Sequence, residues 1–173
     1  ESLKIACYHA NRELELIWVD TEKLEENDKE TWDELKSAKG ILIPGGFGSR
    51  GIEGKILAAR YARENSVPYL GLCLGMQIMT IEFARNVLKD ETITSEEFDE
   101  EKKLNPDKYV IHFMPDQNEH RAKGGTLRLG LYDCAIKKGT LTHKLYKQDL
   151  IQERHRHRYE FNNAYKELLE NAG

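Results

Sequence analysis

The stretch that decides the fold is residues 67–77, "VPYLGLCLGMQ", in which a short apolar run meets a helical pattern at a cysteine. The run itself predicts a buried strand, and the apolar positions of residues 75–88 fall on one broad face, which predicts a helix. Gly71 and Gly75 stand two positions either side of Cys73 and would let the neighbouring backbone pass a tight strand-to-helix turn. The sequence therefore predicts that Cys73 projects from such a turn, above the edge of a sheet.

A second strand and helix precede this turn. Residues 39–48, "KGILIPGGFG", form an apolar run ended by proline and glycines, which predicts a buried strand followed by a loop. Residues 52–65, "IEGKILAARYAREN", predict a helix. The order strand, helix, strand, helix indicates the α/β class with a parallel sheet.

The rest of the chain carries weaker patterns. Before the first strand we expect a helix over residues 3–10, a strand over 13–20 and a polar helix around Trp32 and Leu35. Residues 89–105 are polar and acidic and predict a surface loop. Beyond them we expect additional short strands at residues 109–115, 124–137 and 154–161. A closing helix with an Asn cap is expected at residues 162–173.

Length and composition indicate one globular domain over residues 1–173, with 39% hydrophobic residues. The net charge of −4, with acids and bases interleaved, gives no footprint for nucleic acid or a membrane surface. No apolar window is long enough to span a membrane, and the first residues are neither a signal peptide nor an initiator-Met start, so we expect a cytoplasmic protein that is incomplete at both ends. Cys7, Cys73 and Cys134 lack CxxC spacing, which argues against disulfides and zinc and leaves room for a working thiol.

The chemistry that suits Cys73 is nucleophilic attack. The positive end of the following helix would favour a thiolate, which is the reactive form of cysteine. An acyl-transfer site also needs two N–H donors for the oxyanion, and we expect one from Leu74 and one from the "PGGFG" loop around Gly46. A small cysteine packed in the core remains the alternative for an isolated G-x-C-x-G pattern.

Two other patterns invite different functions. "GFGSRG", residues 46–51, fits the dinucleotide fingerprint GxGxxG, but Cys73 stands where that site needs an acidic residue at the end of the next strand. In "RHRHR" the H-x-H spacing puts His155 and His157 on one face of a strand, without further ligands to complete a metal shell or a wider basic field for nucleic acid. We expect this strand to be structural or to orient a substrate.

Five segments, in this order, resemble the class I glutamine amidotransferase domain of the CTP synthase family: "GILIPGGFGSRGIEGKILAARYAREN", "VPYLGLCLGMQIMTIEFARNVL", "MPDQ", "GGTLRLG" and "ERHRHRYEFN". The resemblance covers nearly the whole chain. It implies the class I amidotransferase fold, which is flavodoxin-like, with a mostly parallel central sheet flanked by helices.

The resemblance implies a glutaminase in which Cys73 attacks the side-chain amide of L-glutamine, releases ammonia and leaves a glutamyl thioester for water to hydrolyse. Glu97 is expected to hold the amino group of the substrate, and Arg158 with Tyr159 its carboxylate, a pairing that suits a zwitterion. Arg50 falls in a segment that is a flexible lid associated with GTP activation in the family. The remaining residues implied for the glutamine site are Gly46, Phe47, Leu74, Gly75, Met76 and Gln77.

The sequence also departs from the family. The family takes the His and Glu of its catalytic triad from a His-Pro-Glu segment, which is absent from the 173 residues, as is the family's first strand. We expect no cofactor or metal in this domain. The parent enzyme is expected to use ATP, Mg²⁺ and GTP, and the expected partner is an amidoligase domain on the same polypeptide, within a homotetramer, which aminates UTP to CTP.

Two alternatives stay open at this point. One is a catalytically inactive module of the same fold that binds glutamine or regulates, which the missing base favours. The other is a different thiol hydrolase of this α/β type, such as a γ-glutamyl hydrolase.

Overall fold

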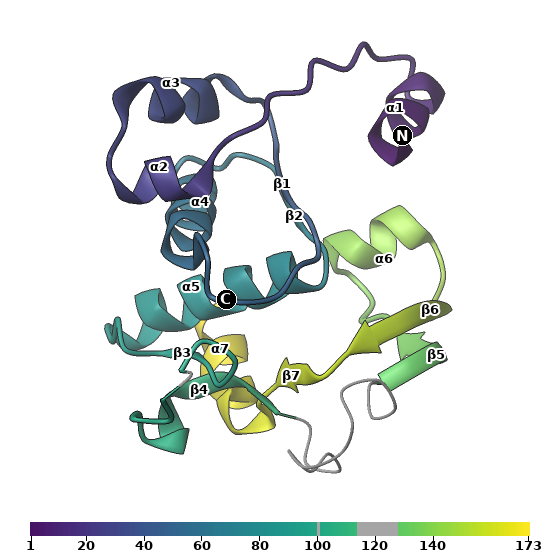
Figure 1. Cartoon of the computed structure of the whole chain (residues 1–173). Helices are drawn as coiled ribbons and strands as arrows, with labels where there is room; N and C mark the ends of the chain where they lie inside the picture. The colour runs from purple at the N-terminus through teal and green to yellow at the C-terminus, as the bar shows by residue number, and fades with distance from the viewer. Residues whose placement is uncertain (100, 114–127) are drawn as a thin grey trace. The chain divides into compact units, whose positions relative to one another are not determined.

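The computed structural model describes residues 1–99, 101–113 and 128–173 (Figure 1). The chain forms two compact units, Glu1–Asn86 and Val87–Gly173. The elements of the first unit, in chain order, are α1 (Ser2–His9), α2 (Thr21–Glu25), α3 (Lys29–Ser37), β1 (Ile41–Ile43), α4 (Ile52–Glu64), β2 (Tyr69–Gly71) and α5 (Leu74–Leu88), whose last two residues reach the second unit.

The first unit is built around a parallel pair of strands, β1 and β2, which run side by side in Figure 1. Ile41 pairs with Tyr69 and Ile43 with Gly71, so both strands end together. The isoleucines of β1 are buried, as are apolar side chains of the two long helices, including Ile56 of α4 and Ile78 of α5. The strand and helix predictions for residues 39–48, 52–65, 67–77 and 75–88 are confirmed, but the expected burial of β2 is wrong, since Leu70 is 53% exposed and its strand neighbours are half-buried.

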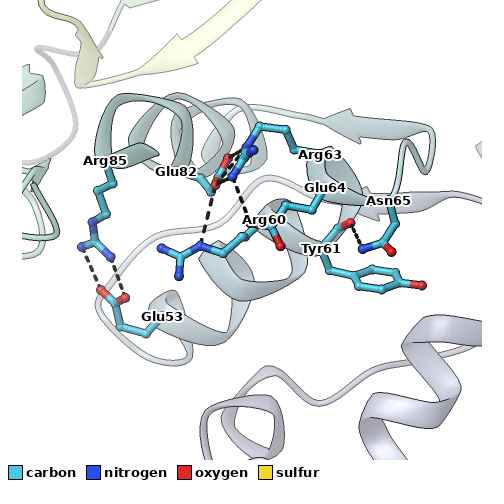
Figure 2. Close-up of polar contacts among 8 residues, drawn as sticks. All are labelled: Glu53, Arg60, Tyr61, Arg63, Glu64, Asn65, Glu82 and Arg85. Atoms are coloured by element: carbon cyan, nitrogen blue, oxygen red, sulfur yellow. Dashed lines mark hydrogen bonds and ion pairs between the residues drawn. The ribbon is translucent and has the colours of Figure 1, made fainter. Parts of the chain in front are cut away.

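Buried charges join α4 to α5. The carboxylate of Glu82 on α5 is only 2% exposed and accepts hydrogen bonds of 2.9 and 3.1 Å from Nε of Arg63 and of 2.8 Å from its Nη2. Figure 2 shows that Arg60 also points to this carboxylate, at 3.8 Å, and that Arg85 of α5 forms a two-pronged pair with Glu53 of α4. A buried carboxylate is tolerated only when it is paired in this way, so the network fixes how the two helices pack.

The second unit contains β3 (Thr94–Ser95), β4 (Tyr109–Phe113), β5 (Arg128–Ala135), α6 (Leu141–Tyr146), β6 (Leu150–His157), β7 (Tyr159–Phe161) and α7 (Lys166–Ala172), with short 3₁₀ turns at Pro106–Lys108 and Asn163–Tyr165. Strand β4 pairs in parallel with β3 and antiparallel with β7. Strands β5 and β6 form a separate antiparallel hairpin in which Arg128 pairs with His157 and Ala135 with Leu150. The additional short strands expected in the second half are therefore present.

The closing helix is shorter than expected. Asn162 caps a 3₁₀ turn by accepting the N–H of Ala164, and α7 starts only at Lys166. The motif "MPDQ", residues 114–117, and the first four residues of "GGTLRLG", residues 124–127, lie outside the described residues, as do the ends of the strands expected at 109–115 and 124–137.

The prediction of a strand over residues 13–20 is wrong. The segment has no strand partner among the described residues, and its Trp18 side chain is 83% exposed. Alternation of apolar side chains indicates which way they face, but a strand forms only when a neighbour accepts and donates backbone hydrogen bonds.

The prediction of a surface loop over residues 89–105 is wrong in part. Ile93, Thr94 and Ser95 are buried, and the last two form β3 against β4. A two-residue strand carries too little pattern to be seen in a polar sequence. Helices α2 and α6 were not expected either, although each starts at a capping side chain, Asp20 and Thr140 respectively.

Among the described residues, no helix has both the length and the apolar character that crossing a bilayer demands.

The buried pair predicts a clear difference between two acidic residues that share Arg63. Glu82→Ala should lower the free energy of unfolding by about 3 kcal/mol, because it leaves Arg63 facing a site without its partner. Glu64→Ala removes an exposed acid 3.4 Å from the same guanidinium and should change stability by less than about 0.5 kcal/mol. Urea denaturation of both variants measures the difference, and equal effects would show that the buried pair does not hold the helices together.

Candidate functional site

Cys73 lies at the turn between β2 and α5. Its side chain is exposed, and its backbone has φ +52°, in the left-handed region. A residue with a Cβ pays about 1–2 kcal/mol to adopt this conformation. Such strain is typical of a functional turn that must project a side chain from the end of a strand.

The glycines on either side of Cys73 are required by close packing. A Cβ on Gly71 would clash with the backbone of Gly75, and a Cβ on Gly75 would clash with the carbonyl oxygen of Ile43. The first turn of α5 therefore sits directly on the end of β1. The backbone N–H of Leu72 extends the sheet by donating to Ile43 O at 2.9 Å, which fixes the turn from its other side.

Helix α5 presents its amino end at Cys73. The N–H groups of Met76 and Gln77 both donate to the carbonyl oxygen of Cys73, at 3.1 and 3.2 Å. Leu74 is the first residue of the helix, and its N–H belongs to the group that an α-helix leaves without an intrahelical acceptor.

The "PGGFG" loop lies against this turn. A Cβ on Gly45 would lie 3.4 Å from the Cβ of Cys73, and one on Gly46 would lie 3.1 Å from Cδ2 of Leu74. The loop that follows β1 and the turn that follows β2 are thus in contact, as the sequence predicts for two segments that supply donors to one oxyanion. Phe47, the next residue, is 86% exposed.

Two further candidates lie on the first turn of α5. Met76 is partly exposed, whereas Gln77 is 5% exposed and its side-chain oxygen Oε1 is buried without a hydrogen-bond partner among the described residues. Leaving a buried acceptor unpaired costs about 1–3 kcal/mol.

Glu97, Arg158 and Tyr159 are brought together in the second unit. Burial raises the pKa of the Tyr159 phenol, the negative charge of Glu97 adds to the rise, and the positive charge of Arg158 opposes it. The Arg158 guanidinium lies 5.9 Å from the centre of the Tyr159 ring. The charges of an acid and of an arginine therefore both act on the Tyr159 phenol.

The ladder of β4 explains how distant parts of the sequence meet at this ring. Tyr159 pairs with Phe113 across the β4 and β7 ladder, and the two rings pack edge to face at 5.3 Å. The backbone N–H of Phe113 donates to the Glu96 carboxylate at 2.7 Å, while the N–H of Glu97 donates to Ser95 Oγ at 3.2 Å. Glu96 thus fastens the segment that carries Glu97 to β4, a role that nothing in the sequence pattern signals.

Comparison with known proteins agrees with this geometry. The model of the class I glutamine amidotransferase family matches residues 1–172. The chain belongs to that family. CTP synthases are among its curated relatives: it is 53% identical over 173 residues to that of Caldanaerobacter subterraneus and 52% identical over 174 residues to that of Listeria innocua.

The match places the chain in one part of these relatives. All of the chain aligns, but it spans only 31% of the length of each relative. Among solved structures, the glutaminase domain of Trypanosoma brucei CTP synthase with bound acivicin is 40% identical, with a TM-score of 0.85 over 96% of this chain and 62% of that one. The chain corresponds to the glutaminase domain of CTP synthase, and the predicted class I amidotransferase fold is confirmed.

The amidotransferase motif around Arg50 is tied to α2. Nε and Nη2 of Arg50 donate to Glu22 Oε2 at 2.8 and 2.5 Å, and this hydrogen bonding lowers the pKa of Glu22. The N–H of Gly54, in the first turn of α4, donates to Glu25 Oε1 at 2.8 Å. A carboxylate therefore occupies the helix start that a dinucleotide diphosphate would need, which argues against that function for residues 46–51.

The two histidines of "RHRHR" contact each other. Nδ1 of His155 lies 2.8 Å from Nε2 of His157, whose own Nδ1 lies 3.1 Å from the carbonyl oxygen of Tyr159. Burial lowers the pKa of His157. No group of three or more metal-binding side chains is found in the part of the chain that the structure describes. The contacts fit a strand that orients its neighbours, Arg158 and Tyr159.

The strain at Cys73 predicts an unusual order of stability among its variants. The free energy of unfolding of Cys73→Gly should be about 1 kcal/mol higher than that of Cys73→Ala, because glycine relieves the strain of the left-handed backbone and alanine does not. Thermal or urea unfolding of the two variants measures this.

Cys134 provides the matched control. It lies on β5 and is not among the residues with positive φ, so Cys134→Gly should be less stable than Cys134→Ala, by about 0.5–1 kcal/mol. The same order at both cysteines would contradict a strained turn at Cys73.

Proposed function

We propose that the chain is a glutaminase that supplies ammonia to CTP synthesis, with Cys73 as the nucleophile. The sulfur of Cys73 attacks the side-chain amide carbon of L-glutamine, which forms a carbon–sulfur bond and moves the carbonyl electron pair to oxygen. The carbon–nitrogen bond of this tetrahedral intermediate then breaks as the carbonyl re-forms. The nitrogen takes up a proton and leaves as ammonia. Water then attacks the thioester, which releases glutamate and returns the thiol.

The observation that carries this proposal is the strained, exposed turn of Cys73 between β2 and α5. The oxyanion of the tetrahedral intermediate is held by the N–H of Leu74 and by the backbone around Gly46, which lies against the Leu74 side chain.

The substrate's zwitterionic end is held by groups of opposite charge. Glu97 binds the amino group, and Arg158 binds the carboxylate with Tyr159 beside it. From the resemblance to the family we also assign Phe47, Gly75, Met76 and Gln77 to glutamine binding.

The proton acceptor for Cys73 is the His of the family's His-Pro-Glu segment, which does not occur in the 173 residues. In the parent enzyme the ammonia passes to an amidoligase domain on the same polypeptide. That domain would use ATP and Mg²⁺ to activate UTP, and GTP would act as an activator of the enzyme. Arg50 belongs to the loop that responds to GTP. The CTP synthase relatives support this assignment over a γ-glutamyl hydrolase. The assembly is a homotetramer in the cytoplasm.

Labelling of the cysteines with a glutamine-mimicking γ-electrophile tests the nucleophile. We expect one adduct per chain at Cys73, formed more slowly in the presence of excess L-glutamine, and no adduct in Cys73→Ala. Intact mass and peptide mapping measure both. Cys7 and Cys134, which are half-buried, serve as internal controls.

Two results would contradict the proposal. Labelling spread over the three cysteines, or labelling of Cys73 that L-glutamine does not slow, would mean that the turn does not recognise glutamine. Faster turnover of γ-glutamyl peptides than of glutamine would instead favour a γ-glutamyl hydrolase.

A further inference from the structure

Helix α2 crosses the start of α4 at very short range. A Cβ on Gly51 would clash with Oγ1 of Thr21, and a Cβ on Gly54 would clash with the Thr21 backbone. Gly51 also has φ +63° and supplies no capping side chain to the helix that it precedes. The start of α4 therefore depends on a neighbouring element for its hydrogen bonds.

Glu25 of α2 provides one of these hydrogen bonds. Gly54 is buried, so its N–H has to be paired within the protein. It donates to Glu25 Oε1 at 2.8 Å. A carboxylate at the third residue of a helix also meets the positive end of the helix dipole, which strengthens the contact.

Lys55 closes the same junction from the other side. Its Nζ donates to the carbonyl oxygens of Arg50 and Gly51, at 2.9 and 3.0 Å, and lies 3.4 Å from Oγ1 of Thr21. The last carbonyls of the glycine-rich loop are thus held by an ammonium that also contacts α2. Glu22 adds the pair with Arg50, but the Arg50 side chain is 84% exposed, and exposed pairs contribute little.

The other end of this loop lies at the nucleophile. Residues 44–51 run from the end of β1 to the cap of α4, and Gly45 and Gly46 lie against Cys73 and Leu74. Only five residues separate Gly46 from the capped start of α4, so a shift at one end of the loop moves the other. The position of the oxyanion-binding backbone thereby depends on how α2 holds α4.

We propose that Glu25 is a positioning residue, which sets the glycine-rich loop for oxyanion binding by capping α4 at Gly54. The inference rests on the proposed glutaminase function. Glu25 does not touch substrate in this account, and it acts through the loop alone.

The test compares three variants of the native polypeptide. Glu25→Ala removes the acceptor, Glu25→Gln keeps an acceptor oxygen without the charge, and Asp33→Ala is the control. Asp33 is an exposed acid of the next helix, and its carboxylate pairs with Lys29 of the same helix.

Two rates at Cys73 are measured for each variant. The first is labelling by a glutamine-mimicking γ-electrophile that carries a carbonyl group, whose oxygen has to be held by the oxyanion-binding backbone. The second is labelling by iodoacetamide, which needs only an exposed thiol. We expect Glu25→Ala to lower the first rate about 10-fold and to leave the second within about 2-fold, since one preorganised donor is worth 10-fold or more in rate. Glu25→Gln should recover most of the loss, and Asp33→Ala should match the wild type.

Hydrogen–deuterium exchange over residues 45–54 reads the cap without reference to activity. We expect faster exchange there in Glu25→Ala than in Asp33→Ala. Unchanged exchange in Glu25→Ala would overturn the proposal, as would an equal fall in both labelling rates, which indicates general destabilisation. If excess L-glutamine does not slow the labelling of the wild type, the proposed function is refuted, and the role of Glu25 with it.

Discussion

The site depends on one close approach, the contact between Gly75 in the first turn of α5 and the carbonyl oxygen of Ile43 at the end of β1. No side chain larger than hydrogen fits there, so the helix can start at once after the strand. That brings Cys73 into a strained left-handed conformation with its thiol exposed, and it puts the amino end of α5 at the same turn. The packing of glycine on a strand end thus presents Cys73 as an exposed side chain at the amino end of a helix.

The strain is sustained by the rest of the first unit. The buried Glu82 and its arginine partners lock α5 to α4, so the helix cannot move away from the turn. Helix α2 in turn caps α4 through Glu25. The chain of contacts runs from α2 through α4 and the glycine-rich loop to Cys73. Its first steps are hydrogen bonds to backbone groups, and its last step is the close packing of Gly45 and Gly46 on Cys73 and Leu74. Such contacts have defined geometry, which suits a site that must hold an oxyanion.

The sequence predicted the elements whose patterns are local. The apolar runs ended by glycines located β1, β2 and the turn of Cys73, because a parallel strand and a tight turn each restrict residue types strongly. It failed where structure depends on partners far along the chain: residues 13–20 alternate but have no described strand beside them, and β3 forms only because β4 is there to pair with it. Glu25 and Glu96 act through single hydrogen bonds to backbone groups of other elements, and no sequence pattern marks such a contact.

The most direct test of the account is the rate of ammonia release from L-glutamine by the native polypeptide, compared with its Cys73→Ala variant. Removal of a catalytic nucleophile lowers kcat by about 10³-fold or more, and the account predicts a loss of that size with the fold intact. Ammonia release at the wild-type rate in Cys73→Ala would contradict the central claim, because it would mean that glutamine is hydrolysed without the cysteine at the turn.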